Sequence, residues 1–209
     1  MIQNVLVVAP HTDDAEFGCG GTISKFISEG KNVFCAAFSS ADESVMEGLP
    51  KDINRTDMIR SMRILGVKEE NIKIFDYKVR KFPEFRQEIL DDLIVLSKEF
   101  QPDLVFLPST FDTHQDHQVI SQEGFRAFKK HCILGYEILW NNLTFTTDAF
   151  ILLNDEDVEK KIESVKCYIS QLDRGYLNDN FLRSLMTTRG GQIGCKYAEA
   201  FQVIRWLIK

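Results

Sequence analysis

Three of the four histidines in this chain stand within two short stretches that also carry acids. The stretches are PHTDDAEFGCGG, residues 10–21, and PSTFDTHQDHQ, residues 108–118. The side chains in them that can bind a cation or move a proton are His11, Asp13, Asp14, His114, Asp116 and His117. Two imidazoles and a carboxylate that meet at one place are typical of a divalent metal site with an open position.

A site of this kind would support hydrolysis. The ion lowers the pKa of a bound water toward neutrality, and a further carboxylate beside it can act as general base. The residues also allow a plainer interpretation, in which the Asp13–Asp14 pair only caps a helix or turn and the histidines are unrelated to it. The two interpretations differ in whether the stretches meet in space, and that depends on the fold.

Short, nearly continuous apolar runs alternate with amphipathic segments through the first half of the chain. We expect strands over residues 4–9, 32–38, 72–75 and 104–107, and helices over residues 20–29, 53–65 and 84–100. Apolar strands of this kind are typical of a parallel sheet covered by helices on both faces. The order predicts an α/β fold with a Rossmann-like, doubly wound, mostly parallel sheet, and we expect residues 1–209 to form one domain.

The two chemically rich stretches follow the first and the fourth predicted strands. In the commonest strand order of doubly wound sheets these two strands are neighbours where the order reverses, and functional loops gather at their carboxyl ends. The fold therefore predicts that the loop carrying His11 and the loop carrying His117 lie side by side. This joint placement favours the metal site over two unrelated loops.

The second half of the chain has a less regular pattern. We expect strands over residues 133–140, 149–153 and 200–207, and a helix over residues 156–171. His131 follows two lysines and is expected at the surface. Phe111 and Trp140 either stack on a ring of a ligand or pack in the core or at a rim. Arg189, in the sequence TTRGG, either holds a substrate phosphate or closes a turn.

The glycines after the first strand allow two interpretations. Gly18-Cys19-Gly20 invites comparison with the dinucleotide-binding motif GxGxxG, but Ile23 stands at the third glycine position and the nearby acids would crowd a pyrophosphate. We expect instead that the glycines let a helix begin close to the sheet. Glu16 is expected to cap that helix or hydrogen-bond to it rather than to bind the metal.

Composition narrows the range of partners. A formal net charge of −6 argues against nucleic acid or an anionic membrane surface as the main partner. The five cysteines are scattered with no CxxC pair, which is typical of reduced thiols in a cytoplasmic protein. We find no basic leader before the first apolar run, and no apolar stretch approaches the roughly 20 residues of a membrane span.

The sequence resembles the PIG-L/LmbE-like de-N-acetylases over nearly its whole length. PHTDDAEFGCGGTI, residues 10–23, is similar to that family's PHPDDAExGCGGTI, and THQDH, residues 113–117, is similar to its HPDH motif. GCKYAEAFQVIR, residues 194–205, resembles the family's closing segment, and YISQLDR, residues 168–174, resembles one of its helices. Thr12 and Gln115 replace prolines of the motifs, but neither position supplies a ligand.

The resemblance implies a zinc-dependent hydrolase that removes the N-acetyl group from an N-acetylglucosamine unit or a related amino sugar. It implies that His11, Asp14 and His117 bind the metal and that Asp13 is the general base. Fe²⁺ is a second candidate for the ion bound in the cell. Family members often assemble as trimers or hexamers, so the resemblance also implies a homo-oligomer.

Further roles are carried over by position. His114 matches the imidazole that stabilises the tetrahedral oxyanion and protonates the leaving amine. Asp116 is expected to hold His114 and to favour its charged form. Arg55 and Tyr197 match residues that border the substrate, although Met58 stands where a glutamate is common near that arginine.

Four function classes remain open from the sequence. The leading one is N-deacetylation of a small amino-sugar substrate. The second is metal-dependent hydrolysis of another amide or an ester, with the same fold and a different pocket. The third is a metal-binding or sugar-binding protein without catalysis, which would have no need for Asp13 or His114. The fourth is a mononuclear Fe(II) oxygenase, which shares the set of two histidines and one carboxylate.

Overall fold

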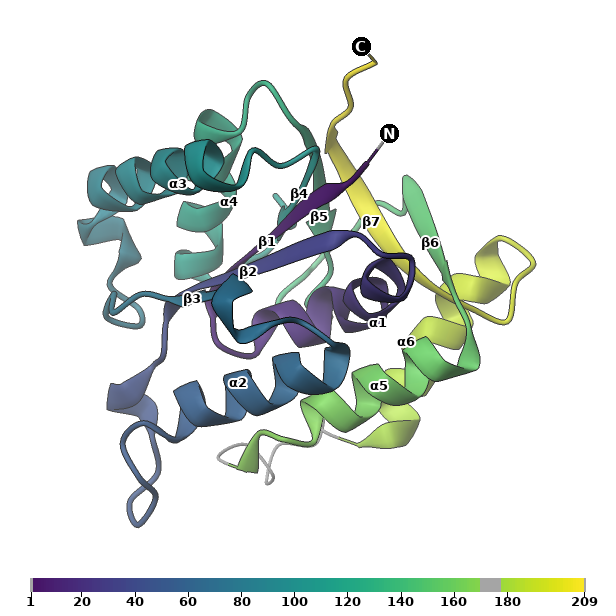
Figure 1. Ribbon diagram of the computed structural model, residues 1–209, viewed down its shortest axis with the longest axis horizontal. Coiled ribbons are helices and arrows are strands. Elements are labelled where there is room, and N and C mark those ends of the chain that lie inside the picture. The colour runs from purple at the N-terminus through teal and green to yellow at the C-terminus, as the bar shows by residue number, and fades with distance from the viewer. Residues whose placement is uncertain (1, 170–177, 209) are drawn as a thin grey trace.

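The structure is a computed structural model that describes residues 2–169 and 178–208. One sheet of seven strands forms its centre, in the order β3-β2-β1-β4-β5-β7-β6 (Figure 1). The strands are β1 (Asn4–His11), β2 (Asn32–Ser39), β3 (Ile72–Ile74), β4 (Leu104–Pro108), β5 (Cys132–Tyr136), β6 (Ala149–Leu153) and β7 (Tyr197–Arg205). The helices are α1 (Asp14–Ser28), α2 (Ile53–Leu65), α3 (Arg86–Phe100), α4 (Gln115–Ala127), α5 (Asp155–Val165) and α6 (Asp179–Gln192), with short 3₁₀ turns at Asp42–Ser44, Glu69–Asn71 and Phe82–Glu84.

The sheet is mostly parallel and reverses its strand order at β1. This strand pairs in parallel with β2 on one side and with β4 on the other. Only β7 runs antiparallel to its neighbours, β5 and β6, among the strands that the structure describes. The predicted doubly wound α/β fold and the predicted contact between the first and fourth strands are therefore confirmed.

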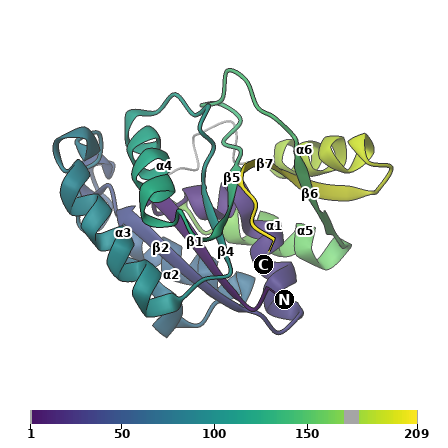
Figure 2. The same cartoon turned by 90° about the horizontal axis from the view of Figure 1, so that it is seen from above.

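Two apolar layers hold the helices on the sheet. Side chains of β1 alternate between them, since Val5 and Val7 belong to one layer whereas Leu6 and Val8 belong to the other. The first layer packs under α1, α2, α5 and α6, and the second under α3 and α4 (Figure 2). Within residues 2–169 and 178–208, no helix has the length and the apolar character to cross a membrane.

Helix α1 differs from the expectation in its starting point. We expected a helix from residue 20, but it begins at Asp14 and is broken at Cys19, where the backbone is not helical (φ −149°, ψ 27°). The glycines around this break allow close packing, because a Cβ on Gly18 would lie 2.3 Å from the ring of Tyr136 and one on Gly21 would lie 2.5 Å from Leu153. The glycines thus allow the helix to lie close to the sheet, as expected, but the helix begins before them and not at them.

Other boundaries also moved. The strand expected over residues 133–140 ends at Tyr136, the strand expected over 200–207 begins at Tyr197, and two helices, α4 and α6, were not expected. The helix expected over 156–171 ends at Val165, and the end of that range lies outside the described residues, as does most of the YISQLDR segment. His131 is half-buried against the ring of Phe128 rather than fully at the surface.

A buried ion pair fixes the break in α1. The Lys161 ammonium donates to a Glu199 carboxylate oxygen at 2.5 Å and to the backbone carbonyl of Phe17 at 2.7 Å. Glu199 also accepts the backbone N–H groups of Gly21 at 3.1 Å and Thr22 at 2.7 Å, which are the free donors of the helical segment after the break. The closing YAEAF segment therefore contacts the glycine motif directly, through Glu199.

We expect Glu199→Gln to lower the free energy of unfolding by about 3–5 kcal/mol, because it leaves the buried Lys161 charge without its counterion. The control is Glu99→Gln, which makes the same chemical change in an exposed pair with Lys73 and should cost less than about 1 kcal/mol. Denaturant unfolding measures both. Equal effects of the two variants would mean that the buried pair does not hold the break.

Candidate active site

The two loops that carry the site residues meet at the carboxyl ends of β1 and β4. His11 is the last residue of β1, and α1 begins three residues later with Asp13 as its N-cap. Pro108 ends β4, and the following loop leads to His114, the N-cap of α4, which places His117 in the first turn of that helix. Because β1 and β4 pair in parallel, both helix starts face the same edge of the sheet.

Three ligand-type atoms form a nearly equilateral triangle at this edge. The Asp14 Oδ2 atom lies 3.1 Å from His11 Nδ1 and 3.2 Å from His117 Nε2, and these two nitrogens are 3.3 Å apart. Ligands bound tetrahedrally at about 2.0–2.1 Å from a zinc ion are separated by about 3.3 Å. The atoms predicted as ligands therefore fit a single divalent ion.

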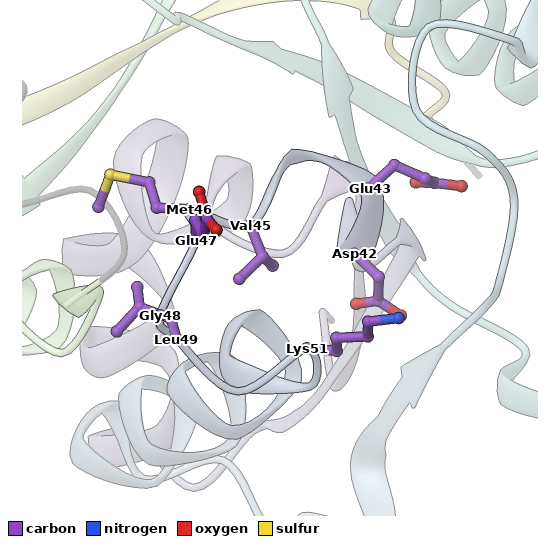
Figure 3. Close-up of a pocket in the computed structure, with 8 residues that line it drawn as sticks. All are labelled: Asp42, Glu43, Val45, Met46, Glu47, Gly48, Leu49 and Lys51. Carbon is purple, nitrogen blue, oxygen red and sulfur yellow. The ribbon is translucent and has the colours of Figure 1, made fainter.

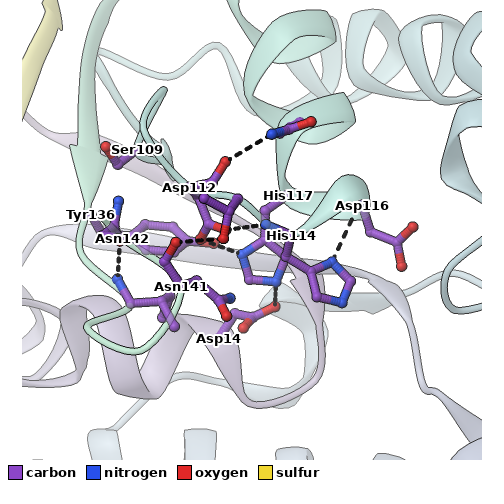
Figure 4. A network of polar contacts seen from close by, with 12 residues as sticks. Asp14, Ser109, Asp112, His114, Asp116, His117, Tyr136, Asn141 and Asn142 are labelled. Carbon is purple, nitrogen blue, oxygen red and sulfur yellow. Dashed lines mark hydrogen bonds and ion pairs between the residues drawn. The ribbon is translucent and has the colours of Figure 1, made fainter. Parts of the chain in front are cut away.

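The outer nitrogen of each ligand histidine faces a fully buried carboxylate. His11 Nε2 lies 3.0 Å from Asp116 Oδ2. His117 Nδ1 lies 2.7 Å from Asp112 Oδ2 (Figure 4). A ring that donates its outer N–H to a carboxylate keeps the lone pair of its inner nitrogen available for a metal. The two carboxylates thus fix the tautomers that a metal site needs.

Electrostatics hold this cluster in a charged state when no ion is bound. Burial would lower the pKa of His11, but hydrogen bonds to Asp116 and Asp14 outweigh it and raise the pKa to about 9. Burial acts likewise on His117, yet Asp14 and Asp112 raise its pKa to about 10. Burial would raise the pKa of Asp14, but the two histidines hold it well below its usual range. The positive charges of protonated His11 and His117 therefore balance the carboxylate of Asp14.

Metal binding at pH 7 should release about two protons, one from each of His11 and His117, because both pKa values lie above that pH. Two ordinary histidines would release only about 0.5 proton together at pH 7. Titration calorimetry in two buffers of different ionisation enthalpy measures this number. The apparent affinity should rise as the pH is raised toward 9, and release of fewer than one proton would contradict the charged cluster.

His114 lies beside the triangle in a different protonation state. Its Nδ1 atom accepts the backbone N–H of Asp116 at 3.2 Å, so the neutral ring carries its proton on Nε2. Its ring centroid is 5.0 Å from that of His11 and 4.7 Å from that of His117. Burial and the charges of His117 and His11 lower the pKa of His114. The ring is therefore suited to donate a hydrogen bond as a neutral imidazole.

The expected role of Asp116 needs correction at this point. We expected Asp116 to hold His114 and to favour the charged form of that ring, but only its backbone N–H contacts the ring. The carboxylate instead accepts from His11 and from the backbone N–H groups of Arg80 and Phe82. The net shift of the His114 pKa is downward, because burial and two like charges outweigh the attraction of Asp116.

The three histidines alone form a second candidate ligand set. One nitrogen from each of His11, His114 and His117 lies within 4.8 Å of the others. This value is an upper limit for the three histidines, whereas the ligand atoms of the set that includes Asp14 are all 3.1–3.3 Å apart. The Nδ1 atom of His114 is also occupied by a backbone donor. The geometry thus favours His11, Asp14 and His117.

Two acids of the first loop occupy different environments. Asp13 is half-buried at the start of α1, next to the ligand Asp14, which leaves its predicted role as general base open to test. Glu16 is fully buried and accepts from the Tyr168 hydroxyl at 2.6 Å. Burial raises the pKa of Glu16 to about 8. Glu16 thus lies inside α1 and bonds to Tyr168 instead of capping the helix, and the expectation that it does not bind the metal remains a prediction.

The structure does not join the three expected substrate residues to the histidine cluster. Arg55 forms an ion pair with Asp76, in the segment after β3. Arg189 lies within α6 and binds the Glu137 carboxylate through two nitrogens, at 2.6 and 3.2 Å, so it does not close a turn. Tyr197 begins β7, with the Lys196 ammonium 5.0 Å from the centre of its ring. Their roles toward a substrate remain predictions.

The segment after β2 also borders the site. It lines an open pocket with Asp42, Glu43, Val45, Met46, Glu47, Gly48, Leu49 and Lys51 (Figure 3). Arg80 ties this segment to the cluster, because its guanidinium lies 3.3 Å from Ser44 Oγ while its backbone N–H donates to Asp116 at 2.5 Å. Arg80 adopts a left-handed backbone conformation (φ 64°), which the contacts on both sides hold in place.

Asp112 is the site residue that the sequence analysis missed. It is fully buried, binds His117 through Oδ2 and accepts the backbone N–H of His114 at 2.8 Å through Oδ1. One signal was present, since Asp112 stands two residues before His114 in the histidine loop. A short polar loop residue of this kind is usually assigned to a turn.

Comparisons with known proteins show which family the chain resembles. A model of the PIG-L family, described as GlcNAc-PI de-N-acetylase, matches residues 6–128, which is more than half of the chain. Diacetylchitobiose deacetylase from Thermococcus kodakarensis is 23% identical over 229 residues, covering 97% of this chain and 84% of the relative.

Solved structures share the fold along nearly the whole chain. N,N'-diacetylchitobiose deacetylase from Pyrococcus horikoshii, solved with an inhibitor, is 26% identical with a TM-score of 0.81, covering 97% of this chain and 84% of that one. The A40926 pseudoaglycone deacetylase Dbv21 is 19% identical with a TM-score of 0.80 and full coverage of both chains, and at this identity the likeness concerns the fold alone.

The matched region contains the whole histidine cluster. Residues 6–128 include the end of β1, the start of α1, and the loop between β4 and α4. Both loops of the candidate site therefore lie inside the part of the chain that the family model recognises. The chain belongs to the PIG-L family, the family of GlcNAc-PI de-N-acetylase.

Proposed function

We propose that this protein is a zinc-dependent hydrolase that removes the N-acetyl group from a small N-acetylated amino sugar of the N-acetylglucosamine type. The observation that carries the proposal is the triangle of His11, Asp14 and His117, with separations of 3.1–3.3 Å. The His114 ring lies beside it, and Asp13 directly precedes the ligand Asp14 in the chain. A protein that only bound metal would not need a carboxylate and an imidazole next to the ligands. The deacetylase relatives support the substrate class.

His11, Asp14 and His117 would hold the ion, and Asp112 and Asp116 would hold the two histidines in the required tautomers. The ion would supply Lewis-acid chemistry, which makes water a nucleophile near neutral pH and polarises the amide carbonyl. Zn²⁺ suits this set of two nitrogens and one oxygen, and Fe²⁺ accepts the same ligands.

The remaining residues would handle protons and charge. Asp13 takes a proton from the attacking water as the new carbon–oxygen bond forms. His114 donates a hydrogen bond from Nε2 to the carbonyl oxygen as negative charge develops there. When the carbon–nitrogen bond breaks, the proton on Asp13 passes to the leaving nitrogen, which gives acetate and a free amine. This assignment differs from the expected one, in which a charged His114 supplied that proton.

The test is acetate release by purified protein from a panel of N-acetyl sugars, with simple N-acetyl amides and acetate esters as comparison substrates. The protein is stripped with chelator and reloaded with Zn²⁺ or Fe²⁺. We expect activity on the sugars that depends on added metal. Activity confined to the non-sugar amides or the esters would favour the alternative hydrolase, and metal binding without turnover would favour a binding protein.

We also propose that the protein acts in the cytoplasm and assembles as a homo-oligomer, a trimer or a hexamer. The scattered cysteines support the first, because reduced thiols suit a reducing compartment. The resemblance to the family supports the second. Light scattering of the metal-loaded protein measures the assembly directly.

A further inference from the structure

Large apolar side chains are exposed close to the histidine loop. They come from that loop and from the segment after β5, and they are Phe111, Leu139, Trp140 and Leu143. Trp140 has the largest ring of this group and is 43% exposed. Exposed apolar groups gathered beside a polar site often mark a surface that binds a ligand.

The Trp140 ring is held by aromatic contacts on the helix side. It packs edge-on against Phe17, with centroids 5.0 Å apart and an interplanar angle of 89°, and lies 6.5 Å from the ring of Phe181. Phe17 stands four residues after Asp13, so the two share one face of the first turn of α1. The indole therefore packs against the first turn of the helix that Asp13 caps.

Backbone contacts fix the other side of the same segment. The Asn141 carbonyl accepts the Thr113 N–H at 3.1 Å and the Thr113 hydroxyl at 2.8 Å, and Asn142 forms a bridge with Asp112. Thr113 directly precedes His114. Trp140 is consequently anchored between the first turn of α1 and the loop that carries His114.

A fixed and partly exposed indole at this place suits one kind of ligand. A pyranose ring presents C–H groups on one face, and these pack against an aromatic ring while its hydroxyls stay in water. Because Trp140 is already held by its neighbours, little conformational entropy is lost when a ligand stacks on it. We propose that Trp140 is a platform for a pyranose ring of the substrate, an inference that rests on the proposed deacetylase function.

The chain offers its own control for a direct binding test. It has two tryptophans, Trp140 and Trp206. Trp206 follows Arg205 at the end of β7, and Arg205 pairs with Ile133 near the start of β5, so Trp206 lies at the edge of the sheet opposite the site. Trp206→Phe leaves Trp140 as the single fluorescent indole, and Trp140→Phe leaves Trp206.

The binding experiment uses the Asp13→Asn background, loaded with Zn²⁺, so that the sugar is not consumed. N-acetylglucosamine and N,N'-diacetylchitobiose are titrated into each single-tryptophan protein. We expect a saturable change in emission when Trp140 is present and none when only Trp206 is present. In otherwise unaltered enzyme, Trp140→Ala should lower kcat/KM by about tenfold through KM, with metal content unchanged.

The two sugars identify the ring that is bound. If Trp140→Ala lowers kcat/KM on both substrates, the ring whose acetamide is hydrolysed stacks on Trp140. If it lowers kcat/KM on the disaccharide alone, the other ring of the disaccharide stacks there. Two results together would contradict the platform but not the deacetylase function. The emission of Trp140 would stay constant at sugar concentrations that calorimetry shows to be saturating, and Trp140→Ala would leave kcat/KM unchanged. A Trp140 emission that changes with protein concentration and not with sugar concentration would also contradict the platform, because a second copy of the chain would then cover the indole.

Failure of the underlying function gives a different result. Metal-loaded wild-type protein would then release no acetate from any sugar in the panel, and calorimetry would detect no sugar binding. In that case both the platform and the deacetylase proposal would be wrong.

Discussion

Replacing Asp13 by Asn is expected to lower kcat by about 10²–10⁴-fold, the usual contribution of a general base. The substitution keeps the size of the side chain and removes its ability to take a proton. Metal should remain bound with stoichiometric occupancy, because Asp13 belongs neither to the triangle of ligand atoms nor to the two carboxylates that hold the histidines. Acetate release and metal content, measured on the same preparation, separate chemistry from binding.

Asp52→Asn is the matched control for this variant. Asp52 is the N-cap of α2, just as Asp13 is the N-cap of α1, so the same chemical change is made at the same kind of position. We expect Asp52→Asn to keep kcat within about twofold, since an exposed substitution of this type has only a small effect. Nearly normal turnover in a metal-loaded Asp13→Asn enzyme would show that another group takes the proton.

The first half of the fold follows closely from the sequence. The helix expected over residues 53–65 has these bounds in the structure, and the expected strands differ from the observed ones by one or two residues at their ends. These segments bury continuous apolar faces, so that hydrophobic pattern and structure coincide. The expected pairing of the first and fourth strands follows from the topology of doubly wound sheets.

Helix α4 shows why a pattern can fail. Several of its buried positions hold polar residues, among them Asp116, His117, Ser121 and Glu123. Glu123 is buried because Arg86 and Arg126 pair with it, and His117 is buried because Asp112 holds it. Burial in this helix is thus stabilised by long-range polar partners, which an apolar periodicity does not reveal.

The site could be located from the sequence, but its inner contacts could not. The motif and the topology brought the two loops together. The histidine that each carboxylate contacts depends instead on the direction of the side chains near the start of a helix. Asp116 contacts His11, and Asp112, which was not expected in the site, contacts His117. A shift of one residue along the chain changes which ring a carboxylate reaches, so spacing alone does not decide it.

Removing a single metal ligand should separate the two candidate ligand sets. If His11, Asp14 and His117 bind the ion, Asp14→Ala and His117→Ala each leave two protein ligands and should greatly reduce metal content, whereas His114→Ala should keep it. Asp112→Asn should lie between these results, with affinity reduced by about 10–100-fold, because it disturbs only the residue that orients His117. Competition with a chromogenic chelator and elemental analysis measure the four variants on one scale.

His131→Ala provides the control for loss of a histidine outside the cluster. His131 packs against Phe128, away from the two loops, and its removal should leave metal affinity unchanged. Circular dichroism and thermal unfolding of each variant show that the protein remains folded. If His114→Ala lost the metal as fully as His117→Ala while Asp14→Ala retained it, the ion would be held by three histidines. His114 could then no longer serve as the hydrogen-bond donor to the carbonyl oxygen, and that role would have to pass to another group at the site.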